Sequence, residues 1–115
     1  MTRNIALAAS LALVLTTPAI ADGLAFEAVV PEGISAERVA NVEKFQASIS
    51  AAQLAAMEAQ GYGAYGAIAI PVAKPGNPVT LANLADRDAA RDAALATCKS
   101  ETGTTCTVIG YLVPA

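Results

Sequence analysis

The stretch that decides the fold is residues 64–113, AYGAIAIPVAKPGNPVTLANLADRDAARDAALATCKSETGTTCTVIGYLV. The pattern reads as strand, turn, strand, helix and strand. Residues 64–70 carry apolar side chains on both faces, so we expect this strand to be central. Residues 79–82 return antiparallel to it, and Pro78 lacks an amide donor, which favours an edge position. With a last strand at 106–113, the sequence predicts an α+β fold with a small three-stranded, mainly antiparallel sheet.

A helix over residues 86–99 connects the second and third strands, giving the order ββαβ. One apolar stripe on this helix recurs at spacings of three and four and should lie on the sheet. Strict alternation along the last strand would put four of its residues on the face that meets the helix. The stripe is Ala90, Ala94, Leu95 and Cys98, and the four strand residues are Cys106, Val108, Gly110 and Leu112.

Residues 1–21 have the pattern of an export signal. Arg3 supplies the positive charge, residues 5–15 (IALAASLALVL) the apolar segment, and residues 19–21 (AIA) a small-x-small cleavage site. An uncleaved membrane anchor is the alternative, but the apolar stretch is short for a hydrocarbon core of ~30 Å. We therefore expect a mature chain that begins at Asp22 and is periplasmic or secreted.

In such an oxidising compartment the chain's two cysteines, Cys98 and Cys106, are expected to form a disulfide. The alternative is a pair of reduced, buried thiols. The bridge would close a loop of about nine residues, which the chain-entropy model values at roughly 2.5 kcal/mol. The disulfide would tie the end of the helix to the start of the last strand.

The mature chain divides into three segments. Residues 22–34 contain Pro31 and Gly33 and predict an extended arm, and residues 35–60 predict one or two helices, with apolar spacing at Val39, Val42, Phe45 and Ile49. Residues 61–115 form the disulfide-linked ββαβ module, and 35–115 should be one domain.

The charge balance excludes two classes of partner. The sequence has seven basic and ten acidic residues, a net charge of −3, and loss of Arg3 with the signal leaves −4. Such a surface repels nucleic-acid phosphates and anionic lipid. We expect no nucleic-acid partner and no membrane partner after cleavage, which leaves a periplasmic protein or a small ligand.

Residues with catalytic or ligating chemistry are few. The sequence has no histidine, and we assign no catalytic, cofactor-binding or metal-binding residue. Residues 61–66 spell G-x-G-x-x-G, but a helix precedes and a strand follows, the reverse of a dinucleotide site. Asp86, Asp88 and Asp92 lack the loop of oxygen ligands that Ca²⁺ requires. The surface that we predict for interaction consists of Tyr62, Tyr65 and Tyr111.

Part of the chain resembles a known family. The strand 65–69 (YGAIA), the Ala-rich helix that ends in Cys98, and the last strand with Cys106 and Val108 resemble a domain of unknown function in small exported bacterial proteins. The mature layout from residue 31 onward is similar to short alphaproteobacterial secreted proteins that are often named 5-aminolevulinate synthase. Neither resemblance implies a catalytic residue.

Two function classes remain, and the first is a noncatalytic exported protein that binds or interacts. The second is a small enzyme or enzyme accessory. We expect no 5-aminolevulinate synthesis, because that reaction needs pyridoxal phosphate on a desolvated lysine. Lys44, Lys74 and Lys99 are each expected in solvent, and a core of Ala, Val and Ile leaves little volume for a pocket of ~300 Å³.

Overall fold

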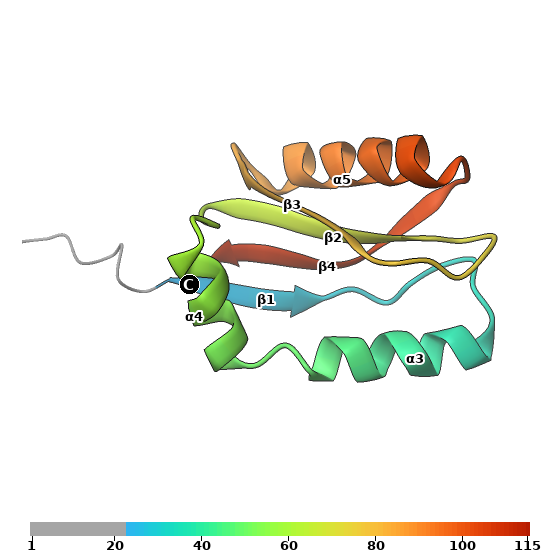
Figure 1. The fold of residues 1–115 in the computed structure, drawn as a ribbon, viewed down its shortest axis with the longest axis horizontal. Helices are drawn as coiled ribbons and strands as arrows, with labels where there is room; N and C mark the ends of the chain where they lie inside the picture. The colour runs from blue at the N-terminus through green and yellow to red at the C-terminus, as the bar shows by residue number, and fades with distance from the viewer. Residues whose placement is uncertain (1–22) are drawn as a thin grey trace, which may run out of the picture.

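The computed structural model describes residues 23–115, which form a four-stranded antiparallel sheet with helices on both faces (Figure 1). The predicted signal at 1–21 and the predicted start at Asp22 lie outside the described residues. The strand order is β1-β4-β2-β3. The elements are β1 (Leu24–Ala28), α3 (Ala36–Ala47), α4 (Ala51–Ala59), β2 (Tyr65–Pro71), β3 (Val79–Leu84), α5 (Arg87–Thr102) and β4 (Cys106–Pro114).

The sheet has two covered faces with different side chains. On one face α5 packs on small residues, and Ala67, Ala69, Ala90, Ala94 and Cys98 are fully buried there. On the other face α3 packs on larger branched residues, with Val42, Ile68, Ile70 and Ile109 as the buried cluster. Figure 1 shows the sheet between α5 and α3. Small side chains allow α5 to lie close to β2, whereas α3 stands on a layer of Ile and Phe.

Most of the predicted sheet is confirmed. β2 is central, β3 pairs antiparallel on one side of it, and β4 pairs antiparallel on the other. β3 is an edge strand, as Pro78 indicates. The predicted α5 stripe also meets the sheet, since Ala90, Ala94 and Cys98 are fully buried and Leu95 packs beside them.

The prediction of three strands is wrong, because residues 22–34, predicted to be an extended arm, contain β1. Leu24–Ala28 pairs antiparallel with β4, from Leu24 opposite Pro114 to Ala28 opposite Gly110. The five-residue strand has too short a pattern to identify by itself, and its pairing partner lies at the far end of the chain. β4 is therefore an inner strand with neighbours on both sides.

A bulge in β4 corrects the predicted faces of that strand. Ile68 pairs with Gly110 but Ala69 pairs with Val108, so Ile109 is an extra residue. One extra residue moves every later side chain to the opposite face. Cys106 stays on the α5 face, whereas a Cβ at Gly110 would overlap the Phe26 ring on the α3 face. Gly110 leaves room for Phe26, not for α5.

The bulge is held by a side chain from α3. The Gln46 amide donates to the carbonyl oxygens of Ile109 at 2.8 Å and Val29 at 2.9 Å. Val29 in turn donates its amide to Ile109 at 3.1 Å. The Ile109 carbonyl at the bulge thus accepts from the Val29 amide and from Gln46, and the Val29 carbonyl accepts from Gln46. Gln46 therefore links α3 to β4 and to the residue that follows β1.

Local signals set the helix ends. Ser35 caps α3 and Ser50 caps α4, so a new helix starts at Ser50. Asp86 caps α5 by accepting from the Ala89 amide at 2.8 Å. Gly103 ends α5 with φ of 75°, a left-handed conformation that favours glycine. Ser, Asp and Gly are residue types that commonly cap helices, so these helix ends can be recognised from the sequence.

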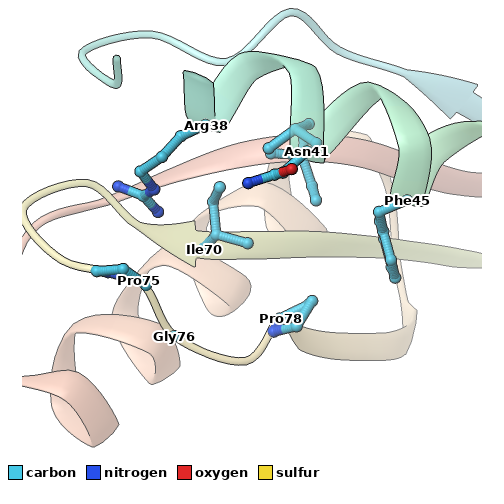
Figure 2. Close-up of a pocket in the computed structure, with 9 residues that line it drawn as sticks. Arg38, Asn41, Phe45, Ile70, Pro75, Gly76 and Pro78 are labelled. Carbon is cyan, nitrogen blue, oxygen red and sulfur yellow. The ribbon is translucent and has the colours of Figure 1, made fainter. Parts of the chain in front are cut away.

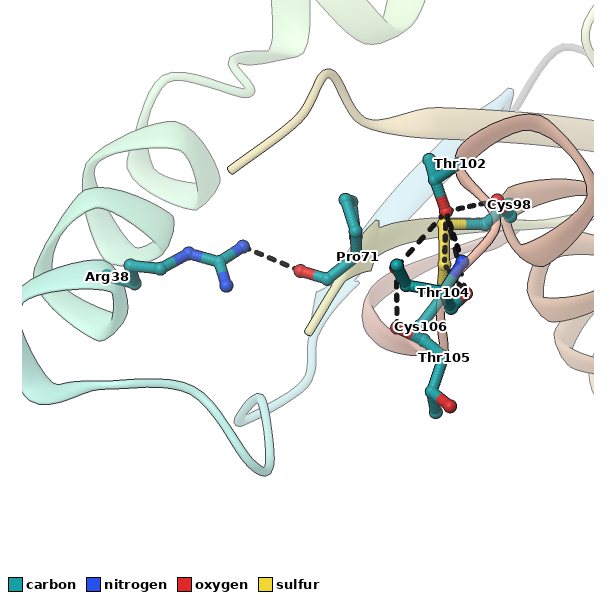
Figure 3. The surroundings of a disulfide bond; sticks show 7 residues. All are labelled: Arg38, Pro71, Cys98, Thr102, Thr104, Thr105 and Cys106. Atoms are coloured by element: carbon teal, nitrogen blue, oxygen red, sulfur yellow. Dashed lines mark hydrogen bonds between the residues drawn. A yellow bond between two sulfur atoms is a disulfide. The ribbon is translucent and has the colours of Figure 1, made fainter. Parts of the chain in front are cut away.

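The predicted disulfide is confirmed. Cys98 and Cys106 are bonded, with their Cα atoms 6.2 Å apart, and the described residues contain no free cysteine. Figure 3 shows the bridge between the end of α5 and the start of β4. Beside it, the Thr102 hydroxyl donates to the Cys98 carbonyl at 2.7 Å. The bridge fixes α5 on its face of the sheet.

Candidate functional site

A pocket of about 290 Å³ opens between α3 and the loop that connects β2 to β3. Val42, Ile70 and Ile109 form its buried apolar floor. Its walls come from two sources, α3 on one side and the β2–β3 loop on the other (Figure 2). The α3 wall has Arg38, Asn41 and Phe45, and the loop wall has Pro75, Gly76 and Pro78. We call this site the α3 pocket.

Arg38 is the one charged residue in the lining of the α3 pocket. Its guanidinium donates to the carbonyl oxygen of Val72 at 2.6 Å. It also donates to the carbonyl oxygen of Pro71 at 2.6 Å, the bond drawn in Figure 3. These bonds hold the first turn of α3 to the end of β2 and to the start of the loop wall. A guanidinium has five N–H donors, so three remain after these two bonds.

Asn41 lies one turn after Arg38 on the same face of α3. Figure 2 shows its amide pointing into the pocket above Ile70. Among the described residues, α3 reaches the sheet through hydrogen bonds of Arg38 and Gln46, and the Asn41 side chain makes none. The pocket therefore combines an apolar floor with one free amide and a partly used guanidinium.

The three predicted tyrosines are not all in one place. Tyr65 and Tyr111 both pack against the α5-side core, and Tyr111 lies opposite Ala67, two residues from Tyr65. They are diagonal neighbours on one face of the sheet. Tyr62 lies instead in the connection between α4 and β2, half-buried. The structure thus brings together two of the three residues.

Charged groups surround the two sheet tyrosines. Arg87 lies over the Tyr111 ring, 5.6 Å from its centre, and pairs with Glu27 at 2.6 Å. A second pocket of about 390 Å³ is lined by Tyr65, Asp86, Arg87 and Asp88. The charges here already have partners: Asp86 accepts the helix-capping bond and Arg87 has Glu27. This pocket offers fewer free groups to a ligand than the α3 pocket.

One ionisable group near this second pocket has a perturbed pKa. A hydrogen bond to Asp92, together with the negative charges of Asp92 and Asp88, raises the pKa of the exposed Arg91 guanidinium. A higher pKa keeps Arg91 charged under all ordinary conditions. The effect stabilises a surface charge cluster and adds no acid or base.

The expectation of little volume for a pocket of ~300 Å³ is wrong, because pockets of about 290 and 390 Å³ open at the surface beside the core. The expectation for the lysines is confirmed: Lys44, Lys74 and Lys99 are all exposed. Neither pocket has a lysine in its lining. Within residues 23–115, no three Cys, Asp or Glu side chains group to hold a metal.

No helix in the described part of the chain is long and apolar enough to cross a membrane. The Cys98–Cys106 disulfide is compatible with an extracellular or periplasmic location.

The sequence did not identify the α3 pocket. Val42 and Phe45 belong to the predicted apolar stripe of α3. The other lining residues come from α3 itself, from β2, from the loop that follows β2 and from the β4 bulge. The available signal was Asn41, a polar residue beside the stripe of α3. Its place in a pocket depends on a loop more than 30 residues later in the chain.

The chain matches no protein-family model, and searches of curated proteins and of solved structures find no significant match. The resemblance to the exported bacterial domain therefore stays a prediction.

Proposed function

We propose that this protein is an exported, noncatalytic binding protein that holds a small ligand in the α3 pocket. The observation that carries the proposal is the pocket itself: a buried apolar floor with the free Asn41 amide beside the Arg38 guanidinium. Small-molecule sites combine apolar walls with a few placed polar groups, and their volumes begin at ~300 Å³. The pocket of about 290 Å³ is close to the lower limit of that range.

The test is a fragment screen on the ¹⁵N-labelled mature chain, followed by backbone amide shifts. We expect binders to shift the amides of α3 and of the loop at 72–78. Asn41→Trp should block the pocket and abolish these shifts. Ala40→Trp is the matched control, because Ala40 is exposed, adjacent on α3 and outside the pocket lining. Shifts that survive Asn41→Trp, or a screen without any binder at α3, would contradict the proposal.

Export is a separate part of the proposal and has its own measurement. The sequence pattern at 1–21 supports cleavage before Asp22. The disulfide supports an oxidising compartment, and we assign the protein to the periplasm or the secreted fraction. The intact mass of the exported protein should correspond to a chain that starts at Asp22. A mass that retains residues 1–21 would indicate an anchored form instead.

The alternative function is a small enzyme or an enzyme accessory, which the name of the similar secreted proteins raises. Pyridoxal phosphate would need a lysine in a pocket, whereas Lys44, Lys74 and Lys99 are exposed. The purified mature chain with pyridoxal phosphate, glycine and succinyl-CoA should give no aldimine band and no 5-aminolevulinate. Product formation that a Lys→Ala variant abolishes would establish the alternative.

A further inference from the structure

We propose that the ligand of the α3 pocket is a monocarboxylic acid with a short apolar body, whose carboxylate lies between Arg38 and Asn41. This inference rests on the proposed function and adds the chemical class of the ligand. It is carried by three features of the pocket: an unneutralised positive charge, unused donors on one helix face, and an apolar floor.

The charge of Arg38 has no carboxylate partner in the described chain. Ion pairs in residues 23–115 are formed by Arg87 with Glu27 and by Arg91 with Asp88 and Asp92. Arg38 is only half-exposed and contacts two neutral carbonyl groups. A partly buried charge is stabilised most by an opposite charge that also accepts its hydrogen bonds. The pocket therefore favours an anion, although the whole chain is acidic.

The donors that remain are placed for a carboxylate. Arg38 and Asn41 are three residues apart on α3, so their side chains are neighbours on one helix face. Figure 2 shows both at the same wall of the pocket. Arg38 keeps three N–H groups and Asn41 offers an amide NH₂, while an ionised carboxylate accepts about four hydrogen bonds. One carboxylate can thus be held by both residues.

The rest of the pocket selects the body of the ligand. Val42, Ile70 and Ile109 are buried beneath it, and Phe45 with the loop prolines forms its sides. The side chains of these residues are apolar and offer no hydrogen bond to further oxygens of a phosphate or of a second carboxylate. A volume of about 290 Å³ admits a short aliphatic or aromatic body. A monocarboxylate satisfies the charge and the apolar floor together.

The test measures dissociation constants of the mature chain for matched probes by calorimetry. Hexanoate, hexanamide and hexylamine share one body and differ in the head group. We expect hexanoate to bind at least about tenfold more tightly than the other two, because hydrogen bonds between charged groups are roughly twice as strong as neutral ones. N-acetylleucine against N-acetylleucinamide repeats the comparison with the chemistry of a peptide C-terminus, and so separates a free acid from a chain end.

Two variants locate the carboxylate. Asn41→Asp places a negative charge beside the ligand and leaves the Arg38 bonds to the backbone available. We expect it to weaken hexanoate binding by about tenfold or more and hexanamide binding by a clearly smaller factor, because only hexanoate is repelled by the new charge. Arg38→Lys keeps the charge but loses the guanidinium geometry, and should weaken hexanoate more than hexanamide. Thermal unfolding of each variant shows whether the fold is retained.

The outcomes separate the two proposals. Equal affinity for hexanoate and hexanamide, blocked by Asn41→Trp, would overturn the carboxylate assignment while the α3 pocket remains a binding site. If N-acetylleucine binds more tightly than N-acetylleucinamide while hexanoate and hexanamide bind equally, the ligand is a peptide C-terminus. That result would overturn the proposal of a free monocarboxylic acid. Failure of every probe would overturn this inference, and the fragment screen then decides the proposed function.

Discussion

The exchange Gly110→Ala tests the position of the β4 bulge, on which the second core face depends. A Cβ at this position would overlap the Phe26 ring, whereas the Glu27 carbonyl oxygen, at 3.3 Å, would have to move by only a few tenths of an ångström. A bulky neighbour in a packed face cannot move without cost. The clash is therefore with one side chain, and shortening that side chain should relieve it.

The expected changes in the free energy of unfolding follow from overpacking at Gly110 and from its relief when Phe26 is shortened. One extra methyl in a filled core costs about 1–3 kcal/mol, so we expect Gly110→Ala to lower the free energy of unfolding by about 2 kcal/mol. Phe26→Leu alone should cost about 1 kcal/mol, since it removes part of a half-buried ring. The double variant should lose about 1 kcal/mol in total, which is about 2 kcal/mol less than the sum.

Urea unfolding followed by far-ultraviolet circular dichroism measures all four proteins. Gly66→Ala is the control, because its Cβ would lie 2.5 Å from the Leu81 carbonyl oxygen, a backbone atom. Phe26→Leu should not relieve that clash. If losses at Gly110 and Phe26 add to within about 0.5 kcal/mol, Gly110 does not face Phe26 and the bulge is wrongly placed.

Three further changes test other contacts by the same unfolding assay. Replacing both Cys98 and Cys106 with Ser should lower the free energy of unfolding by about 2–3 kcal/mol, because the unfolded chain gains loop-closure entropy. An unchanged urea midpoint would mean that the disulfide does not stabilise the fold. Asn83 has φ of 67°, and its side-chain amide forms hydrogen bonds with two backbone groups of the α4–β2 connection. Asn83→Ala should therefore lower the free energy of unfolding by about 2 kcal/mol, and Asn83→Gly by about 1 kcal/mol less than that. Equal losses would exclude backbone strain at this position. Gln46→Glu removes the donor at the bulge and should cost about 2 kcal/mol at neutral pH, whereas no loss would mean that water replaces the amide.

The predictable part of the fold was the part with local signals. Residues 64–113 show their strands through apolar runs bounded by Pro and Gly, and the α5 stripe through its spacing. β1 has no such signal, because five residues between the signal pattern and Pro31 become a strand only through pairing with β4. The β4 bulge is also invisible locally, since its extra residue is defined by the register with β2.

The same distinction explains the candidate site. The tyrosines were selected as residues suited to interaction, yet their positions depended on tertiary structure, which left Tyr62 apart from the other two. The α3 pocket joins residues from α3, β2, β4 and the loop 72–78. A site formed by four separate segments has no sequence spacing to detect. Only its α3 wall, with Arg38 and Asn41 three residues apart, leaves a local trace.

The two faces of the sheet are held together in different ways, and the proposed binding site lies on the α3 face. On the α5 face, the alanines in the core are fully buried and a disulfide joins α5 to β4. We therefore expect α5 to move little relative to the sheet. On the other face, two long polar side chains, Arg38 and Gln46, link α3 to the sheet by hydrogen bonds. They are eight residues apart, about 12 Å along the helix, and the pocket opens between them. A ligand in that space would contact α3, the floor and the loop at once, so its binding energy would add to the docking of α3.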